Sequence, residues 1–501
     1  MKGTQSWNVR MSPPYGGFAP GYWKNALLSH GNKNHASAMI DVDMTDPTKM
    51  TQGPGLAALT NGTQAVAVTT TIKHILDIPV STDLTFAIGS NKLYRLSAST
   101  VTNGSADSIT WPYTIDKAVV TGEDGESVAY YNGKLYGFYN HSGSAGDILQ
   151  YDLAGTIDPD WGSTIPTAAA TLQNAPHPSI VGGDDVLYFG NGRYVGYYDQ
   201  STTTISVDDL DLPVGSKVVD LAYPDSLVWA AVNYPNLSGS NANVGYIYTW
   251  RGVGISSWED QPLIRFNGTI GAIYVKDGRV FVWYQDLSGV SSGGYKLGVV
   301  EGNAIRQLRA YSGTLPNFAQ RGEYQNMLAW ISDGKLHVFG AIDDQLPAFH
   351  AIHADGGYAT AGALSVPFGT PLISSTDGAT NFQLAKFSGY SILSTWKSIV
   401  FSAVDSVIDE VRIYYKSQGA SARCDVTVSY NQAASSLLLQ KSGQTGTLTH
   451  ANDGSYIFKS FYPKLSVQDF RIDLSWTSGS AANPMDIREI IIFGHTEAKE
   501  G

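Results

Sequence analysis

The chain has 501 residues, of which 43% are hydrophobic and only 15% charged, and its formal net charge is −12. An acidic chain without a run of Lys and Arg has no general attraction for phosphate backbones, so direct nucleic-acid binding is not expected. The single cysteine, Cys424, excludes an intrachain disulfide framework, and without an apolar leader or a stretch of 18 apolar residues neither a signal peptide nor a membrane span is expected.

Residues 1–62 are irregular, because they are rich in Gly and Pro, which break both helices and strands. They also contain Tyr15, Phe18, Tyr22 and Trp23, and such aromatic residues are unusual in a disordered tail. The composition predicts an extended docking arm that lies either on its own chain or on a neighbouring molecule.

The acidic stretch "IDVDMTDP" within this arm resembles part of a calcium loop. Asp41, Asp43 and Asp46 supply carboxylates, but an EF-hand needs Gly where Asp46 stands and Glu where Gln52 stands. We therefore interpret the stretch as a solvated acidic turn and predict no metal site.

From residue 63 the pattern changes to strand, turn, strand, and "SVAYYNGKLYGFYN" (127–140) shows it best. Asn-Gly and Asp-Gly favour two-residue hairpin loops, because both loop residues adopt positive φ. Related stretches occupy residues 84–98, 185–199, 225–236, 271–286 and 326–341. Weaker third and fourth strands follow most of them.

Four antiparallel strands repeated every 40–50 residues are typical of a β-propeller, whose blades stack because none can bury both faces alone. Residues 63–385 are predicted to form six such blades, with seven as the alternative. Residues 63–78 would either complete the last blade or start a seventh, and residues 365–382 would be a linker or an odd strand pair. A long two-sheet sandwich with similar turns is the rival architecture.

Residues 386–501 show a different alternation. Between residues 470 and 476, apolar side chains alternate with polar ones, which is the pattern of a sheet with one solvent-exposed face. Several strands of this kind predict a C-terminal β-sandwich of jelly-roll type. The predicted fold is therefore all-β throughout.

Candidate catalytic residues are few. His350 and His353, near Asp355, could share a face and bind a metal on a helix, but residues three apart on a strand point to opposite faces. We interpret this segment as a strand and expect two ordinary histidines.

The pairs Asp184–Asp185 and Asp208–Asp209 could serve glycoside hydrolysis, which uses two carboxylates. Both pairs lie at expected turns or strand ends, where Asp is favoured for backbone hydrogen bonding, and we prefer that interpretation. Cys424 is expected to be a small core residue. We predict no catalytic, cofactor-binding or metal-binding residue.

Aromatic residues are the remaining candidates for recognition. Exposed aromatic rings stack on sugars or anchor interfaces, whereas those on strands, such as Tyr136, are expected in the core. The interaction candidates are Tyr15, Phe18, Tyr22, Trp23 and Trp258.

The leading segment at 31–64, the NGKLY-type units and the stretch "WKSIVFSAVDSVIDEVRIYY" (396–415) together resemble β-propeller structural proteins of tailed-bacteriophage virions, of tail, nozzle or tail-tip type. The resemblance covers the whole layout and carries no catalytic residue. It implies a non-enzymatic virion component without a cofactor, assembled in the host cytoplasm and located in the tail. It also implies docking on other virion proteins and on copies of itself in a symmetric ring.

Two alternatives remain open. One is a tail-tip or fibre protein that binds a host surface glycan or receptor protein. The other is a polysaccharide hydrolase, because propellers also carry glycosidases.

Overall fold

The computed structural model describes residues 5–11 and, with gaps, residues 38–496. The longest ranges outside this description are 12–37, 98–112, 162–171 and 352–361. The described chain is built mainly from strands and includes the short 3-10 turn Phe318–Gln320, so the prediction of an all-β protein is confirmed. None of the described helical structure is long and apolar enough to cross a membrane.

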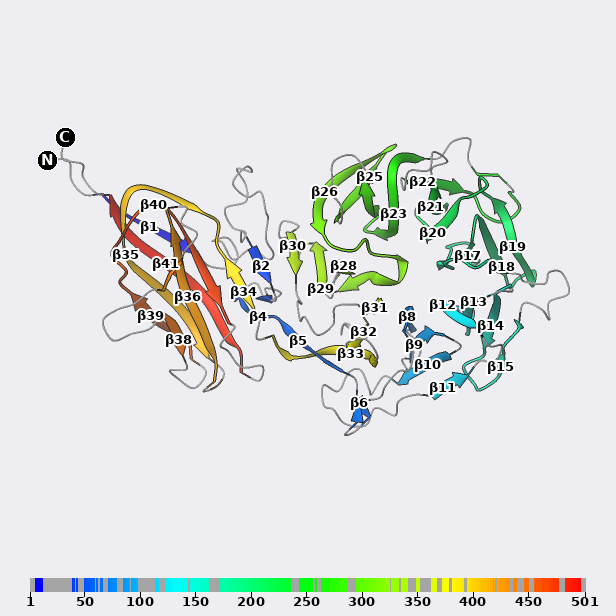
Figure 1. The fold of residues 1–501 in the computed structure, drawn as a ribbon, viewed down its shortest axis with the longest axis horizontal. Helices are drawn as coiled ribbons and strands as arrows, with labels where there is room; N and C mark the ends of the chain where they lie inside the picture. The colour runs from blue at the N-terminus through cyan, green and yellow to red at the C-terminus, as the bar shows by residue number, and fades with distance from the viewer. Residues whose placement is uncertain are drawn as a thin grey trace.

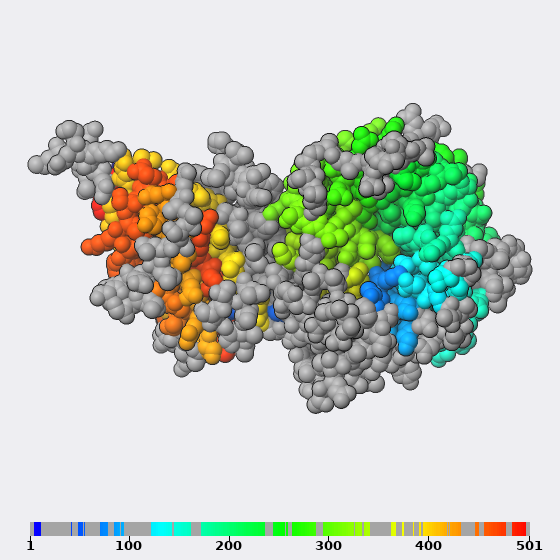
Figure 2. All heavy atoms as spheres, viewed as in Figure 1, coloured from blue at the N-terminus to red at the C-terminus, as the bar shows by residue number. Residues whose placement is uncertain are grey.

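Two lobes lie side by side, a propeller and a sandwich (Figures 1 and 2). The propeller consists of successive four-stranded antiparallel units. The first three are β8–β11 (His74–Ile78, Leu84–Gly89, Lys92–Ser97, Tyr113–Asp116), β12–β15 (Glu123–Tyr131, Lys134–His141, Asp147–Tyr151, Ile157–Asp158) and β16–β19 (Ser179–Val181, Leu187–Asn191, Tyr194–Asp199, Thr204–Asp211).

The next two units share one long strand. They comprise β20–β22 (Lys217–Ala222, Val228–Pro235, Asn243–Trp250), the shared β23 (Ile264–Lys276) and β24–β26 (Arg279–Asp286, Gly294–Glu301, Ala304–Ser312). Residues 264–267 of β23 pair with β22, and residues 268–276 pair with β24. The change of partner makes β23 the outer strand of one unit and the inner strand of the next.

The last two units are β27–β30 (Arg321–Tyr324, Met327–Ser332, Lys335–Gly340, Ala348–Ala351) and β31–β33 (Ala363–Ser365, Leu372–Asp377, Asn381–Tyr390) with β5 (Pro54–Ala58). β5 comes from the N-terminal segment and pairs with β33, so the start of the chain completes its last unit. Within residues 365–382, predicted as a linker or an odd strand pair, β32 and the start of β33 form a strand pair of this unit.

The units form a ring because neighbouring first strands contact one another, from β8 through β31 and back to β8 (Figure 1). Buried apolar clusters lie at the junctions between units. Phe86 and Leu93 of the first unit pack with Val128 of the second. At the closing junction, Ile75 of the first unit packs with Leu384 of the last.

The hairpin turns follow the predicted chemistry. Asn132 and Gly133 have φ of 46° and 80°, and Asp277 and Gly278 have φ of 50° and 69°. The predicted turn at Asn191 is shifted by one residue, because Asn191 pairs with Tyr194 and the loop is formed by residues 192–193. The Asn191 side chain instead accepts a hydrogen bond from the Gln173 backbone at 2.6 Å.

The uneven spacing of the hairpins has a structural cause. The hairpin at 127–140 joins the first and second strands of its unit, whereas those at 84–98 and 185–199 join the second and third. β8, within the stretch 63–78, is the inner strand of the first unit. The same type of turn therefore joins different pairs of strands in different units, which makes the spacing of the turns along the sequence uneven.

The sandwich contains β34–β41 and strands from the N-terminal segment. Their bounds are β34 Thr395–Lys397, β35 Phe401–Ser417, β36 Arg423–Tyr430, β37 Ser436–Leu438, β38 Thr447–Thr449, β39 Ile457–Phe461, β40 Leu465–Ser475 and β41 Met485–Thr496. β35 pairs with β41 and β39, and its first residues pair with β40, which connects the two layers.

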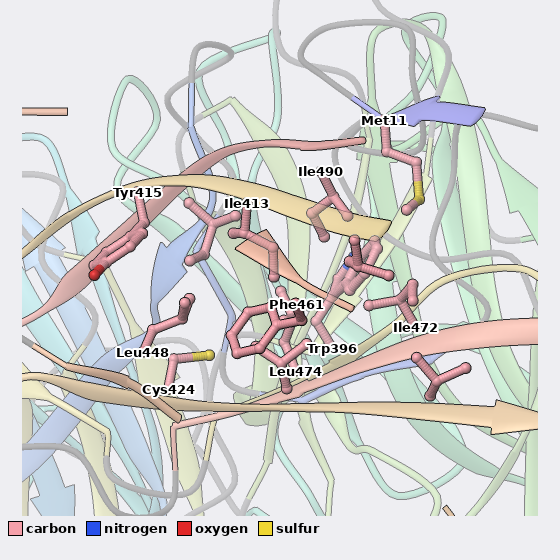
Figure 3. Packing of buried hydrophobic residues seen from close by; sticks show 14 of the residues in the cluster. Met11, Trp396, Ile413, Tyr415, Cys424, Leu448, Phe461, Ile472, Leu474 and Ile490 are labelled. Carbon is pink, nitrogen blue, oxygen red and sulfur yellow. The ribbon is translucent and has the colours of Figure 1, made fainter. Parts of the chain in front are cut away.

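A single apolar core lies between these layers (Figure 3). Ile413 and Ile490 come from one layer, and Ile472 and Leu474 from the other, and all four are at most 1% exposed. The predicted alternation is confirmed, since Arg471, on the opposite face of β40, donates a 2.6 Å hydrogen bond to Asp473.

The described parts of residues 1–62 pair with the same chain. β1 (Ser6–Met11) joins β41, β2 (Ala38–Ile40) joins β34, and β5 completes the propeller. The short pairs β3 with β4 (Val42–Asp43, Thr51–Gln52) and β6 with β7 (Thr60–Asn61, Gln64–Ala65) account for the other described strands of this segment. These strands link the two lobes. Of the two alternatives predicted for the arm, its described parts follow the one in which it lies on its own chain.

Candidate functional site

A cavity of about 410 Å³ lies where the first strands of four consecutive units meet. Its walls come from β16, β20, β23 and β27 and from the residues that follow β16 and β20. The lining residues are Ile180, Val181, Gly183, Leu221, Ala222, Tyr223, Ile273, Tyr274, Val275 and Arg321. An apolar wall with a few convergent polar groups is typical of a small-molecule site.

A buried ion pair fixes one side of this cavity. Arg321 donates from Nε and Nη2 to the two carboxylate oxygens of Asp220, at 2.7 and 2.5 Å. The backbone amides of Leu221 and Ile273 donate to the same carboxylate, at 2.8 and 2.7 Å. Burial lowers the pKa of Arg321, but the charge and hydrogen bonds of Asp220 outweigh it and raise that pKa. Arg321 is therefore a fixed cation with little freedom to turn toward a ligand.

Tyr274 lies beneath this guanidinium, whose carbon is 5.2 Å from the ring centroid. Its hydroxyl donates to Glu323 at 3.2 Å, and Lys276 donates to the same carboxylate at 3.1 Å. Burial, and then the charge of Glu323, raise the pKa of Tyr274 to about 12. The hydroxyl therefore stays protonated at neutral pH and can act as a donor.

Asp184 and two tyrosines form a cluster behind the lining residue Tyr223. The hydroxyls of Tyr188 and Tyr223 both hydrogen-bond the Asp184 carboxylate, the former at 2.5 Å. The two rings stack with centroids 6.1 Å apart. Gly252 has φ of +94°, and a Cβ there would lie 2.4 Å from the Tyr188 hydroxyl oxygen, so this close approach requires glycine. Hydrogen bonds, ring stacking and the close approach of Gly252 therefore hold this cluster in place.

A second polar group lies on the neighbouring units and outside the cavity lining. Lys73 binds Asp124 at 2.5 Å and also contacts Glu126. His74 accepts a hydrogen bond from the Val128 backbone at 3.1 Å. Burial, and then the positive charge of Arg321, lower the pKa of His74 to about 4, so its ring is neutral at pH 7.

The structure separates the predicted acidic pairs. Asp184 and Asp185 lie in the turn between β16 and β17, as expected, and Asp184 also binds the hydroxyl of the lining residue Tyr223. Asp208 and Asp209 lie on β19, the outermost strand of that unit. Burial, and then the charge of Asp208, raise the pKa of Asp209. The sequence did not indicate that only one of these four carboxylates adjoins a cavity.

The other candidates fall into two groups. His350 lies on β30, which agrees with the strand interpretation, and Asp43 lies on β3. Asp41, Asp46, His353, Asp355, Tyr15, Phe18, Tyr22 and Trp23 lie outside the described residues. Within the described part of the chain we find no group of three His, Cys, Asp or Glu residues that could hold a metal ion.

Trp258 packs against its own propeller. Its ring makes an edge contact with Tyr248, with centroids 5.4 Å apart, beside the cluster that joins the third and fourth units. Cys424 is buried in the sandwich, where burial raises the pKa of its thiol. Both are packing residues, as expected for Cys424.

The cavity residues Tyr223, Tyr274, Asp220 and Arg321 were not singled out from the sequence. Asp220 and Arg321 are 101 residues apart, and no local motif connects them. Their shared signal is position, because each lies on or directly after a first strand. An alignment of the units by their first strands would have placed these residues at equivalent positions. The hairpin motifs do not give that alignment, because they join different pairs of strands in different units.

A comparison with protein-family models and one with curated proteins found no match. Solved structures are similar to this chain at 10–14% identity. One is a glycoside hydrolase family 43 arabinoxylan arabinofuranohydrolase from Bacillus subtilis, with 10% identity, a TM-score of 0.30, and 88% of this chain and 99% of that chain covered.

Another is an exo-β-1,3-galactanase from Phanerochaete chrysosporium, with 12% identity, a TM-score of 0.32, and coverage of 88% and 100%. A puromycin-hydrolysing peptidase from Mycobacterium tuberculosis has 14% identity, a TM-score of 0.40, and coverage of 66% and 55%. At these values the likeness is limited to the fold and carries no activity or substrate over to this chain.

These comparisons contradict the prediction of a non-enzymatic structural component of a phage virion. The similar structures described above are hydrolases, and none of them is a virion protein. The expectation that the chain is not an enzyme also gains no support. Virion location, virion partners and assembly into a ring stay predictions, because no comparison bears on them. The β-propeller is the part of the resemblance that the structure supports.

Proposed function

We propose that this protein binds a saccharide in the axial cavity of its propeller. The observation that carries the proposal is the cavity itself, where two tyrosines and a guanidinium from separate units join an apolar wall, and each of them binds a carboxylate behind it. The axis of the ring is the place where residues distant in sequence are held on rigid strands.

The chemistry of the rim suits a hydroxyl-rich ligand. Sugars present donors and acceptors around an apolar ring face, and they are bound by aromatic rings together with carboxylates and other polar side chains. Tyr223 and Tyr274 offer hydroxyls and ring surface, and Asp184 and Glu323 offer acceptors. Each of these carboxylates already orients one lining tyrosine.

Glycoside hydrolysis is a second candidate, favoured by one observation. Asp184 and Glu323 are carboxylates from different units that each bind the hydroxyl of a lining tyrosine. Glycosidases use two carboxylates that flank the scissile bond. Release of reducing ends from a bound oligosaccharide, abolished by both Asp184→Asn and Glu323→Gln, would establish this function in addition to binding.

We also infer that the ring has seven blades, the alternative that the sequence left open, closed by β5. The pairing of β5 with β33 and the apolar cluster shared by β8 and β33 support this count.

Binding is tested with a glycan array, followed by isothermal titration of the best oligosaccharide. Tyr223→Phe and Tyr274→Phe keep the rings and remove one hydroxyl each. We expect each to weaken binding about three- to tenfold, the effect of one hydrogen bond. Tyr462→Phe is the matched control, because Tyr462 lies on the sandwich and is 41% exposed. No binding to any glycan, or equal loss in the control, would refute the proposal.

A further inference from the structure

We propose that the saccharide bound in the axial cavity carries an acetamido group, whose carbonyl oxygen accepts a hydrogen bond from Arg321 and whose methyl group packs on the aliphatic wall. This inference rests on the proposed function and adds the chemical class of the ligand. It depends on two properties of the residues that line the cavity: the donors that Arg321 still offers, and the apolar surface that the wall leaves exposed.

Arg321 lines the cavity with part of its donor capacity unused. A guanidinium has five N–H groups, and Arg321 uses one on Nε and one on Nη2 to bind Asp220. Asp220 is its only hydrogen-bond acceptor among the described residues, and the Arg321 side chain is 15% exposed. The guanidinium is planar, so its two Nη1 hydrogens lie on the edge that faces away from Asp220. Arg321 therefore needs no movement to bind an acceptor on the ligand.

The acceptor that suits this edge is a neutral oxygen. Asp220 already balances the charge of Arg321, and the other cation near the cavity, Lys276, is paired with Glu323 at 3.1 Å and with Asp277 at 3.6 Å. An anionic group of the ligand would find both of these cations already neutralised. A carbonyl oxygen requires a donor but no uncompensated charge, and a hydrogen bond from a charged donor is stronger than one from a neutral donor.

The aliphatic wall provides a surface for a methyl group. Val181 is 39% exposed, and Ile180 and Val275 are half-buried, although all three side chains are apolar. Val275 lies two residues after Ile273 on β23, so both side chains point to the same face, and the Ile273 backbone amide binds Asp220. The exposed apolar surface therefore extends close to the buried ion pair.

An acetamido group combines the two requirements, because its carbonyl oxygen and its methyl group are bonded to the same carbon atom. A plain hexose offers hydroxyls to an aliphatic wall, which gains nothing by covering them. A 6-deoxy sugar offers the methyl group without the carbonyl. The cavity is therefore expected to rank acetamido sugars above 6-deoxy sugars, and 6-deoxy sugars above plain hexoses.

The test is titration of the full chain at pH 7 with two hexamers of the same linkage, β-1,4-linked N-acetylglucosamine and β-1,4-linked glucose. We expect the acetylated hexamer to bind about tenfold more tightly, the effect of one hydrogen bond to a charged donor. Saturation-transfer NMR should show the strongest transfer at the acetyl methyl protons, because they lie on the aliphatic wall. The glycans that bind best on the array should also carry acetamido groups.

Arg321→Lys tests the donor, because it keeps a cation beside Asp220 and removes the planar edge. It should reduce the preference for the acetylated hexamer to within about twofold. Arg306→Lys is the matched control, since Arg306 also pairs with a carboxylate, Glu301, but lies on the outer strand β26. The preference should survive this change. Urea denaturation verifies that each variant is folded, and the comparison of the two hexamers on the wild-type chain stands without either variant.

The possible failures separate the inference from the proposed function. Equal binding of the two hexamers, or an array on which the best glycans lack acetamido groups, would overturn the inference and leave saccharide binding in place. So would a preference that the folded Arg321→Lys variant retains in full. Absence of binding by both hexamers and by every glycan on the array would overturn both proposals.

Discussion

The two lobes bury their strands in different ways. The sandwich has one continuous apolar core, to which both layers and the N-terminal residue Met11 contribute (Figure 3). The propeller divides its core among the junctions between units and leaves polar side chains along the axis, among them Asp220 and Arg321. The lobe with a divided core is therefore the one that can hold a binding site at its centre.

This difference between a continuous and a divided core predicts which lobe each substitution affects. Substitutions at the axis should affect the propeller and its ligand, whereas substitutions in the sandwich core should affect the stability of that lobe. Hydrogen exchange, read peptide by peptide, separates the two effects.

The largest effect is expected from Asp220→Asn, which leaves Arg321 buried without its partner charge. Asp220 is 1% exposed and Arg321 is 15% exposed. Breaking such a pair costs about 3–5 kcal/mol of the free energy of unfolding, measured by urea denaturation. Exchange should increase in the propeller alone. The double variant Asp220→Asn/Arg321→Met should recover part of the loss, because no unpaired charge remains; a single variant within 1 kcal/mol of wild type would contradict this account.

Ile472→Ala should be next, at about 2–4 kcal/mol, because it leaves a cavity in the sandwich core. Ile472 is fully buried. Exchange should increase in β35, β36, β40 and β41 and remain unchanged around the propeller axis. Val404→Ala, at a side chain that is 60% exposed, is the control and should change stability by less than about 0.5 kcal/mol. Spread of the effect to the axis would show that the lobes unfold together.

The pH dependence of the propeller should follow His74 and His177. Burial lowers the pKa of each ring to about 4 in the folded protein, whereas an unfolded His titrates near 6.5. Between these values the unfolded state binds more protons, so stability is complete above about pH 6.5 and is lost as pH falls toward 4. The loss is on the order of 3 kcal/mol at most for each histidine.

Urea denaturation at several pH values would measure this slope. His74→Gln should remove about half of this slope across that range, and Val404→Ala, at an exposed side chain of the sandwich, should leave it unchanged. An unchanged slope in the His74 variant would contradict the assignment.

The smallest effect is expected from Glu301→Gln on the propeller surface. Glu301 pairs with Arg306 at 2.7 Å, and both side chains are more than half exposed. Exposed pairs of this kind contribute less than about 1 kcal/mol. A change in unfolding free energy larger than that would show that the outer strands are as sensitive as the axis.

The sequence predicted the features that depend on local chemistry. Asn132-Gly133 forms its turn because two adjacent residues favour positive φ, and residues 470–476 alternate because one face of β40 is buried. Tyr136 is buried, as expected for a strand aromatic. These signals lie within a few residues of one another.

The features that depend on closure of the ring were not predictable in the same way. The N-terminal segment was expected to be an extended arm on its own chain or on a neighbour, and the sequence did not indicate that its strand β5 pairs with β33, more than 300 residues later. Asp220 and Arg321 meet only because the units curve around one axis. Neither pairing leaves a periodic or local signal, so the site could not be read from the chain alone.

The most direct test of the central claim is an experimental structure of the protein with the tightest-binding oligosaccharide. We predict a sugar ring in the axial cavity, in contact with Tyr223 and Tyr274. A sugar bound only at the outer strands of the propeller or on the sandwich, with the cavity filled by water alone, would contradict it.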